Sequence, residues 1–286
     1  MRDALFITLQ HLLPQHFLSR LVLRLTRVRT PAVKNTLISK FIGGFRPDMS
    51  EADQPDALRY GSFNEFFTRA LRPGVRPVDS NPQTLISPVD GTVSQIGQLD
   101  GSRLVQAKGR DFTLEDLLAA PPACGWPERF RGGGFATLYL APYNYHRLHM
   151  PLAGTLRAAW FVPGRLFSVN AATATAVPNL FARNERVVCV FENRTTVFAL
   201  VLVGALFVGS IATAWHGDIT PRSRQPASLP LDSSRVPLHL EKGAEMGRFN
   251  MGSTVILLTP AGFADWLPGF AAGSRVRMGE ALARLR

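Results

Sequence analysis

Near its C-terminal end the chain reads Gly247-Arg248-Phe249-Asn250-Met251-Gly252-Ser253-Thr254-Val255-Ile256-Leu257-Leu258, so that a Gly-Ser-Thr tripeptide precedes an apolar run. The apolar run predicts a buried β-strand. Gly252 has no Cβ, so it can adopt a strained backbone conformation that leaves its carbonyl open to the Ser253 hydroxyl. Attack by that hydroxyl would convert the amide to an ester, and elimination of the ester would leave a dehydroalanine that hydrolyses to a pyruvoyl group. A small-residue turn entering a strand explains the same tripeptide without any chemistry.

The surrounding segments make the chemical interpretation stronger. The segments Met246-Gly247-Arg248-Phe249, Gly252-Ser253-Thr254 and Val255-Ile256 resemble the processing site of the phosphatidylserine decarboxylases, with Met251 where that family more often has Leu. Other motifs of the same family are matched in its order by Ser87-Pro88-Val89-Asp90-Gly91, Tyr145-His146-Arg147-Leu148-His149-Met150-Pro151, Phe167-Ser168-Val169-Asn170 and Asn179-Leu180-Phe181-Ala182-Arg183-Asn184-Glu185-Arg186. The resemblance extends over most of the chain.

The resemblance implies autocatalytic cleavage between Gly252 and Ser253, followed by decarboxylation of phosphatidylserine to phosphatidylethanolamine and CO2. The cut would give a large chain, residues 1–252, and a small chain, residues 253–286, that begins with a pyruvoyl group derived from Ser253. This covalent group would form a Schiff base with the substrate amine and accept the electrons released as CO2 leaves, as pyridoxal phosphate does elsewhere. No separate cofactor is expected.

One aspartate and two histidines are the candidate catalytic residues beside Ser253. An Asp-Gly pair such as Asp90-Gly91 most often forms a tight turn, and an isolated histidine is more often structural than catalytic. Self-cleavage needs a base for the Ser253 proton and an acid that orients this base, and the resemblance gives these roles to His149 and Asp90. His146 is the candidate acid that protonates the substrate carbon. The histidine spacing also suits a metal, but no further ligand cluster in the sequence supports a metal site.

Phe167, Ser168 and Asn170 are candidate substrate-binding residues by the same resemblance. Their segment offers apolar surface and hydrogen-bonding groups for a glycerophosphate head beneath acyl chains. A strand followed by an Asn turn is the alternative interpretation.

The composition favours a folded protein with an anionic partner. Of the 286 residues 46% are hydrophobic and 19% charged, and the formal net charge is +11. The chain is therefore too apolar for disorder, and its charge suits either an anionic membrane or nucleic acid. No nucleic-acid-binding motif is recognisable, so we expect no nucleic-acid partner. Cys124 and Cys189 are the only cysteines, which excludes a disulfide framework and favours a reducing compartment.

Residues 1–50 form a basic and amphipathic segment. They contain eight Lys or Arg against two acids, and Leu and Phe recur at helical spacing. No apolar run approaches the ~18 residues of a membrane-spanning helix, and no signal-peptide cleavage site follows. The helices either lie on a membrane surface or pack on the protein's own core, and the resemblance to a lipid enzyme favours the membrane. We expect a peripheral protein on the cytoplasmic face of the cell membrane, with residues 1–55 as the membrane-associating part.

Residues 56–286 are predicted to form a catalytic domain of mostly antiparallel β-sheet, which makes the chain α+β. A helix should begin at Pro31 and end at Gly43-Gly44, and a capping box at Ser62 should open another that reaches Leu71. Short β-rich runs begin after Pro82. The uncharged stretch 197–215 has the length of a membrane span, but its Val content and two glycines favour buried strands. Residues 221–237 are predicted to be a loop.

Two rival functions use the same features. One is a pyruvoyl-dependent decarboxylase of a soluble amino acid, which the basic amphipathic start disfavours. The other is a non-catalytic membrane-surface binding module in which Gly-Ser-Thr is merely a turn, and such a protein would remain one chain. The large and small chains of one precursor are expected to stay together, and a homodimer is compatible with the sequence.

Overall fold

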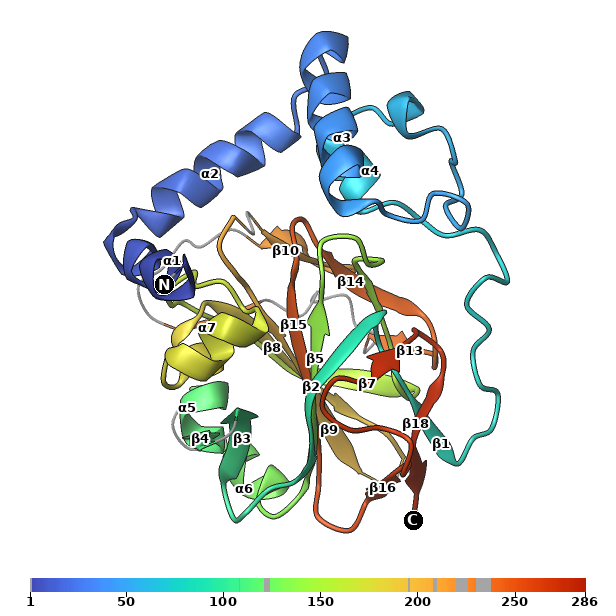
Figure 1. The fold of residues 1–286 in the computed structure, drawn as a ribbon. Coiled ribbons are helices and arrows are strands. Elements are labelled where there is room, and N and C mark those ends of the chain that lie inside the picture. The colour runs from blue at the N-terminus through green and yellow to red at the C-terminus, as the bar shows by residue number, and fades with distance from the viewer. Residues whose placement is uncertain are drawn as a thin grey trace.

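The computed structural model describes residues 2–107, 109–120, 124–194, 196–207, 210–219, 226–229 and 238–286. A β-rich body makes up most of it, and the N-terminal helices lie over one end of this body (Figure 1). The sheets are antiparallel, so the predicted α+β class with a β-rich body and N-terminal helices is confirmed.

The largest sheet in the described residues places the strand after Gly252 at its centre. Its nine strands follow the order β12-β7-β8-β9-β15-β5-β2-β17, with β13 beside β7. β15 therefore pairs with β9 on one side and β5 on the other, both antiparallel. The bounds are β2 Gly91–Gln98, β5 Gly134–Leu140, β7 Gly154–Val162, β8 Arg186–Glu192, β9 Val197–Val203, β12 Ala227–Ser228, β13 His239–Leu240, β15 Ser253–Thr259 and β17 Arg275–Val276.

The two faces of this sheet carry separate hydrophobic cores. Val255 and Leu257 of β15 belong to one core, and Ile256 and Leu258 belong to the other. All seven residues of β15 are buried. A strand covered on both faces needs apolar side chains at every position, which explains the uninterrupted apolar run after Thr254.

The uncharged stretch 197–215 forms strands, as predicted. It contains β9 and β10 (Ile211–Thr213). Across the described residues, no helix combines the length and the apolar character that crossing a bilayer requires.

Smaller sheets flank the large one and carry the histidine motif. A four-stranded sheet among the described residues has the order β11-β10-β14-β6, with β6 Arg147–His149, β11 Gly217–Ile219 and β14 Glu245–Phe249. β6 pairs with β14, the strand that leads to Gly252. A further sheet has the order β1-β18-β16, and β3 pairs with β4; the bounds are β1 Thr84–Ile86, β3 Arg103–Ala107, β4 Arg110–Thr113, β16 Ala264–Trp266 and β18 Ala281–Leu285.

The first two helices turn their polar side chains toward the body. These helices are α1 (Arg2–Leu12) and α2 (Gln15–Thr26). Buried positions on them are Gln10, Gln15, Ser19 and Thr26, whereas large apolar side chains are exposed at Phe6, Leu9, Leu12, Phe17, Leu21 and Leu25. A helix that packs on its own protein's core shows the reverse arrangement. These six apolar side chains therefore do not serve the core of this molecule.

Two buried hydrogen bonds help to attach these helices to the segment that follows β7. Gln10 Oε1 accepts the backbone N–H of Ser168 at 2.7 Å, and Gln15 Oε1 accepts that of Leu166 at 2.9 Å. Both glutamines are at most 3% exposed. Two buried glutamines that each satisfy a backbone N–H fix the orientation of α1 and α2, and they keep the apolar stripe outward.

An aromatic cluster joins α3 (Pro31–Phe45) to α4 (Phe63–Phe67), across the predicted domain boundary at residue 55. The predicted start of α3 at Pro31 is correct, and the helix extends one residue beyond Gly44. Ser62 Oγ accepts the Glu65 N–H at 3.1 Å, so the predicted cap is present. The cluster consists of Ile38, Phe41, Phe63, Phe66 and Phe67.

The predicted extension of α4 to Leu71 is wrong. The helix ends at Phe67, because Ala70 and Leu71 instead pair with residues 52 and 53: the Asp53 N–H bonds the Ala70 carbonyl at 3.0 Å, and Ala52 bridges Leu71. Short helices complete the fold: η1 Ala57–Arg59, α5 Leu114–Leu118, α6 Trp126–Phe130, α7 Ala171–Ala176 and α8 Leu180–Arg183. Of the predicted loop 221–237, residues 221–225 and 230–237 lie outside the described residues, and β12 occupies part of the rest.

Candidate active site

The bond between Gly252 and Ser253 lies where the chain enters β15, against the ring of His146. A Cβ on Gly252 would lie 3.5 Å from His146 Nε2 and 3.5 Å from the Leu140 carbonyl oxygen. Gly252 is not among the glycines with positive φ, so the expected strained backbone is not found in that form. The missing side chain instead leaves the edge of the His146 ring close to the bond.

His146 is a buried neutral base whose outer nitrogen is free. Its Nδ1 lies 2.8 Å from the Asn144 carbonyl oxygen, which can only accept, so Nδ1 carries the proton. Nε2 is left as an acceptor and has no hydrogen-bond partner among the described residues. The Phe67 ring packs on the imidazole with 4.1 Å between ring centroids. Burial lowers the pKa of His146 to about 3, so the ring is neutral at physiological pH.

The Ser253 hydroxyl is also buried and unpaired among the described residues. Its exposed fraction is 0%, and Oγ makes no hydrogen bond. Most buried polar atoms in proteins are hydrogen-bonded, because leaving one unpaired costs about 1–3 kcal/mol. Two unpaired atoms, Ser253 Oγ and His146 Nε2, on residues that flank and contact Gly252 indicate a site kept for a reaction or a ligand.

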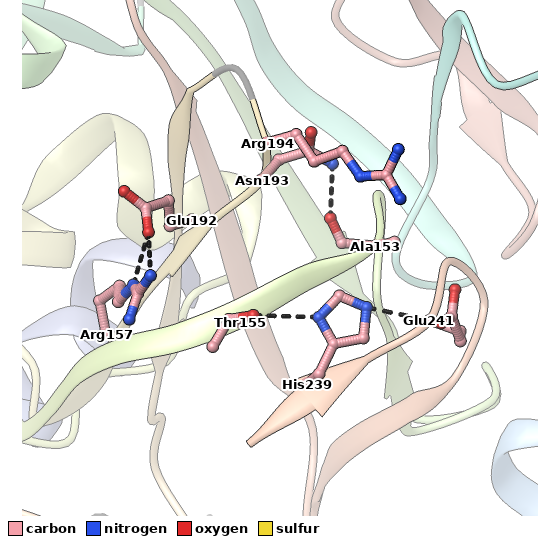
Figure 2. A pocket seen from close by; sticks show the side chains of 8 residues that line it. All are labelled: Ala153, Thr155, Arg157, Glu192, Asn193, Arg194, His239 and Glu241. Atoms are coloured by element: carbon pink, nitrogen blue, oxygen red, sulfur yellow. Dashed lines mark hydrogen bonds and ion pairs between the residues drawn. The ribbon is translucent and has the colours of Figure 1, made fainter. Parts of the chain in front are cut away.

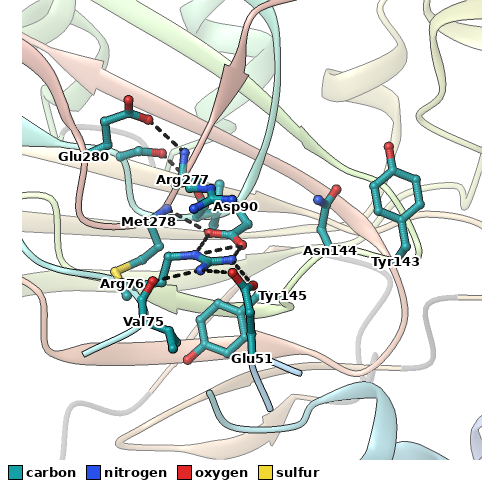
Figure 3. Close-up of polar contacts among 12 residues, drawn as sticks. Glu51, Val75, Arg76, Asp90, Tyr143, Asn144, Tyr145, Arg277, Met278 and Glu280 are labelled. Carbon is teal, nitrogen blue, oxygen red and sulfur yellow. Dashed lines mark hydrogen bonds and ion pairs between the residues drawn. The ribbon is translucent and has the colours of Figure 1, made fainter. Parts of the chain in front are cut away.

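His149 lies on β6 and is held by two hydrogen bonds. Its Nδ1 donates to the Gly243 carbonyl at 2.7 Å, and its Nε2 accepts from the Tyr145 hydroxyl at 2.9 Å. Burial lowers the pKa of His149. His149 is therefore a neutral base as well, but its basic nitrogen is occupied by Tyr145 (Figure 3 shows the Tyr145 side of this contact).

Asp90 is bound by an arginine rather than by His149. Arg76 donates to both Asp90 oxygens at 2.6–3.1 Å and to both Glu51 oxygens at 2.6 and 3.0 Å (Figure 3). The Met278 N–H also donates to Asp90 at 2.9 Å. The expected hydrogen bond from His149 to Asp90 is thus not formed, because the planar guanidinium and one backbone N–H donate to the carboxylate instead. These hydrogen bonds raise the pKa of Arg76, and they lower the pKa of Glu51.

The candidate substrate residues support the N-terminal helices. Phe167 is fully buried between His11, with 4.8 Å between ring centroids, and the Arg183 guanidinium at 5.2 Å. Asn170 caps α7 by accepting the Thr173 N–H at 2.9 Å. The backbone N–H of Ser168 bonds Gln10, as described above. Within the described residues none of the three forms a hydrogen bond with the Ser253 hydroxyl.

Glu185 is a buried acid beneath α2. It is 3% exposed, and its Oε2 lies 3.7 Å from His16 Nδ1 without a hydrogen bond. Burial raises the pKa of Glu185 to about 8. The side chain therefore carries a proton at neutral pH.

Comparison with known proteins identifies the family. A family model described as phosphatidylserine decarboxylase matches residues 63–284, and one described as PSD matches residues 5–46. Relatives named phosphatidylserine decarboxylase proenzyme occur in Bordetella pertussis, 52% identical over 99% of this chain and 95% of the relative, and in Pseudomonas fluorescens, 51% identical over 99% and 98%. This chain belongs to the phosphatidylserine decarboxylase family.

The sequence did not predict that Arg76 and Glu51 surround Asp90 in this member of the phosphatidylserine decarboxylase family. Arg76 lies outside the motifs that carry the family resemblance, and nothing local to it marks it as the partner of Asp90. Glu51 lies within the segment assigned to membrane association. Their pairing becomes visible only when the chain folds residues 51, 76 and 90 together, so no signal in the sequence would have found it.

A hollow of about 520 Å³ lies away from these residues, beside β7, β8 and β13 (Figure 2). Its side chains pair mainly with one another: Arg157 with Glu192, Thr155 with His239, and His239 with Glu241. It contains none of the candidate catalytic residues of the phosphatidylserine decarboxylase motifs. The described part of the chain holds no group of three or more His, Cys, Asp or Glu side chains that could bind a metal ion.

Proposed function

We propose that this chain is a proenzyme that cleaves itself between Gly252 and Ser253 and then decarboxylates phosphatidylserine to phosphatidylethanolamine. The observation that carries the proposal is a pair of buried atoms at this bond, Ser253 Oγ and His146 Nε2, that have no hydrogen-bond partner among the described residues. The names of the relatives agree with it, since a proenzyme is a precursor that is activated by processing.

Cleavage uses the hydroxyl of Ser253 and a nearby base. Oγ attacks the Gly252 carbonyl carbon, its proton passes to the base, and the amide C–N bond breaks to leave an ester and a free amine at residue 253. Loss of the α-proton and of the Gly252 carboxylate gives dehydroalanine. Addition of water and release of ammonia then give the pyruvoyl group. Each step needs only proton transfers and one water molecule.

His149 is the proposed base for cleavage, with Asp90 as its partner. A general base works best when its pKa lies near the operating pH. Burial lowers the pKa of both histidines, and it brings the pKa of His146 to about 3, which makes His146 a weak base at neutral pH. The relay requires Asp90 to exchange Arg76 for His149, because the carboxylate is bound by Arg76 in this structure.

His146 is the proposed proton donor during decarboxylation. The pyruvoyl group supplies an electrophilic carbonyl for the substrate amine and a sink for the electrons that CO2 leaves behind. His146 Nε2 lies beside the position of this group, and the buried surroundings exclude water from it. An anionic substrate would offset the cost of charging the ring and raise the pKa of His146, so the proton becomes available when substrate is bound.

The proposed place of action is the surface of an anionic membrane. The outward apolar side chains of α1 and α2, together with the basic residues of the N-terminal segment, suit a helix pair that lies in the interfacial plane. We propose peripheral attachment at the cytoplasmic face. A decarboxylase of a soluble amino acid would have no use for this surface. A non-catalytic binding module would have no use for buried polar atoms at residues 146 and 253 that find no partner in the described part of the chain.

Mass spectrometry of the purified protein, beside an assay of CO2 release, tests the proposal. We expect two polypeptides, residues 1–252 and residues 253–286, and the small chain should resist Edman degradation because a pyruvoyl group has no amine. Phosphatidylserine in mixed micelles should release CO2, and free serine should not. Fully active material that is a single intact chain would refute the mechanism, and preference for a free amino acid would favour the rival decarboxylase.

A further inference from the structure

Arg69 is a buried arginine whose charge is poorly satisfied. It is 3% exposed, and Nη2 donates to the Tyr143 carbonyl at 3.2 Å. Nε and Nη1 have no hydrogen-bond partner among the described residues. The Phe66 ring lies 5.7 Å from the guanidinium carbon, and burial lowers the pKa of Arg69. A buried cation with two unused N–H groups is costly unless an anion is present for part of the functional cycle.

The acids near Arg69 are already used by other groups. Asp48 accepts the N–H and the hydroxyl of Ser50 at 2.9 and 2.7 Å. Glu51 and Asp90 share Arg76. No carboxylate in the described residues forms an ion pair with Arg69, so an anion from outside the chain would have little competition.

Arg69 forms part of the wall of a hollow of about 340 Å³ that is lined by five arginines and by the acids Asp48, Glu51 and Asp90, whose hydrogen bonds are described above. Arg46, Arg275 and Arg277 line the same hollow, are exposed, and make no side-chain ion pair among the described residues. Figure 3 shows the side of this hollow formed by Asp90, Arg277 and Tyr143 to Tyr145. We call Arg46, Arg69, Arg275 and Arg277 the arginine pocket.

The arginine pocket adjoins the reaction site. Its wall includes Asn144, whose carbonyl accepts the Nδ1 proton of His146. Phe67, two residues before Arg69, packs on the other side of the same imidazole. The segment 143–146 therefore carries both the proposed proton donor and part of the wall of the pocket.

We propose that the arginine pocket binds the phosphate group of the substrate headgroup. This inference rests on the proposed function and adds a recognition site to it. A phosphodiester has two non-bridging oxygens that match the fork of a guanidinium. The substrate carboxylate is the poorer candidate, because it leaves as neutral CO2, and a cation bound to it would stabilise the ground state more than the transition state.

Binding to an uncut protein separates this inference from the cleavage chemistry. Ser253→Ala keeps the whole chain and cannot form the pyruvoyl group. Isothermal titration of this variant should detect glycerophosphoserine and inorganic phosphate but not free serine. Adding Arg275→Gln and Arg277→Gln should weaken glycerophosphoserine binding about ten- to a hundredfold, the range expected for hydrogen bonds to charged groups. Arg69→Lys, which keeps the charge but loses the fork, should weaken it also.

Arg284→Gln is the matched control, because Arg284 is an exposed arginine of the same C-terminal region that does not line the pocket. It should leave glycerophosphoserine binding unchanged. Equal loss in the control would show a general charge effect and overturn the inference. Binding of free serine with no binding of phosphate would also overturn it, in favour of a carboxylate site.

Kinetics distinguish the substrate phosphate from that of a neighbouring lipid. In the self-processing protein, Arg275→Gln/Arg277→Gln should raise the KM for short-chain phosphatidylserine in micelles and leave the extent of cleavage unchanged. If the variant has normal KM but binds phosphatidylglycerol vesicles less well than Arg284→Gln does, the pocket serves a bystander lipid and the inference fails. If the native protein decarboxylates phosphatidylserine while the Ser253→Ala protein binds no phosphate compound, only the pocket assignment fails.

Discussion

Replacing Leu12 and Phe17 by serine should detach the protein from anionic membranes without unfolding it. Among the side chains of α1 and α2 that the structure describes, these are the two most exposed large apolar ones, at 77% and 62% exposed. Neither belongs to a hydrophobic core cluster of the described residues. Their removal therefore costs little in the folded protein beyond the lower helix propensity of serine, which is about 0.5 kcal/mol per site.

The expected loss of membrane affinity follows from these exposed fractions. Full burial of a Leu or Phe side chain contributes about 1.5–3 kcal/mol. Scaled by the exposed fractions, the two side chains together would contribute about 2–4 kcal/mol on entering the membrane interface. Since 1.4 kcal/mol corresponds to a factor of ten, the partition coefficient should fall about 30- to 700-fold.

Sedimentation with vesicles of phosphatidylglycerol and phosphatidylcholine measures the partition coefficient, and thermal unfolding measures stability. High salt should release the native protein only in part, because salt screens the cationic contribution and leaves the apolar one. The double variant should be released to a greater extent by the same salt. Leu58→Ser/Val105→Ser is the matched control, because both side chains are 45% exposed and lie outside α1 and α2. Unchanged vesicle binding by Leu12→Ser/Phe17→Ser, with an unchanged unfolding temperature, would refute the proposed docking face.

The other predictions concern the reaction site and Glu185. Ser253→Ala should fold, run as one uncut chain on a denaturing gel, and release no CO2. Any cleavage of this variant would exclude the Ser253 hydroxyl as the nucleophile. His149→Ala and Asp90→Ala should fail to cleave, because general-base help contributes ~10²–10⁴-fold, whereas His146→Ala should cleave and release CO2 slowly; the reverse pattern would exchange the two histidine roles. Glu185 is protonated in the folded protein up to about pH 8 and ionises near 4.5 when unfolded, so its contribution to stability is present below 4.5 and is lost as pH rises to about 8. Denaturant unfolding across this range should show that Glu185→Gln gains stability relative to the native protein as pH rises, by at most about 1.4 kcal/mol per pH unit; parallel curves would contradict the raised pKa.

Local sequence patterns predicted the elements whose hydrophobic residues follow directly from how the element is buried. The apolar run after Thr254 could only be a strand buried on both faces, and the stretch 197–215 followed from the same argument. The helical spacing of Leu and Phe in residues 1–50 predicted α1 and α2, although it left open which way their apolar faces point. The structure decides this through Gln10 and Gln15. Glutamine is usually a surface residue, but these two are buried because they accept the backbone N–H groups of residues 168 and 166.

The sequence motifs located the reaction site but did not predict all the hydrogen-bond partners of its residues. His146 and Ser253 do lie together at the predicted cleavage bond. The Asp90–His149 hydrogen bond is an expectation from the roles that these residues have by resemblance, and the competing guanidinium of Arg76 lies outside the motifs that carry the resemblance. A carboxylate accepts hydrogen bonds from the donors that the folded chain places beside it. For Asp90 one such donor is Arg76, which also binds Glu51, and the three residues are far apart in the sequence.

β15 gives the proposed maturation a consequence for how the molecule holds together. Cleavage before Ser253 would leave the small chain with the central strand of the large sheet, hydrogen-bonded to β5 and β9, and with β18 between β1 and β16. The two polypeptides would be interlocked without a covalent link, and unfolding would become a dissociation whose midpoint depends on protein concentration. A denatured precursor can refold as one chain, but a denatured mature protein must first bring its two halves back together. Maturation would thus remove the covalent connection that helps the chain to fold. The mature native state would then persist because its unfolding is slow, that is, because of a high activation barrier to unfolding.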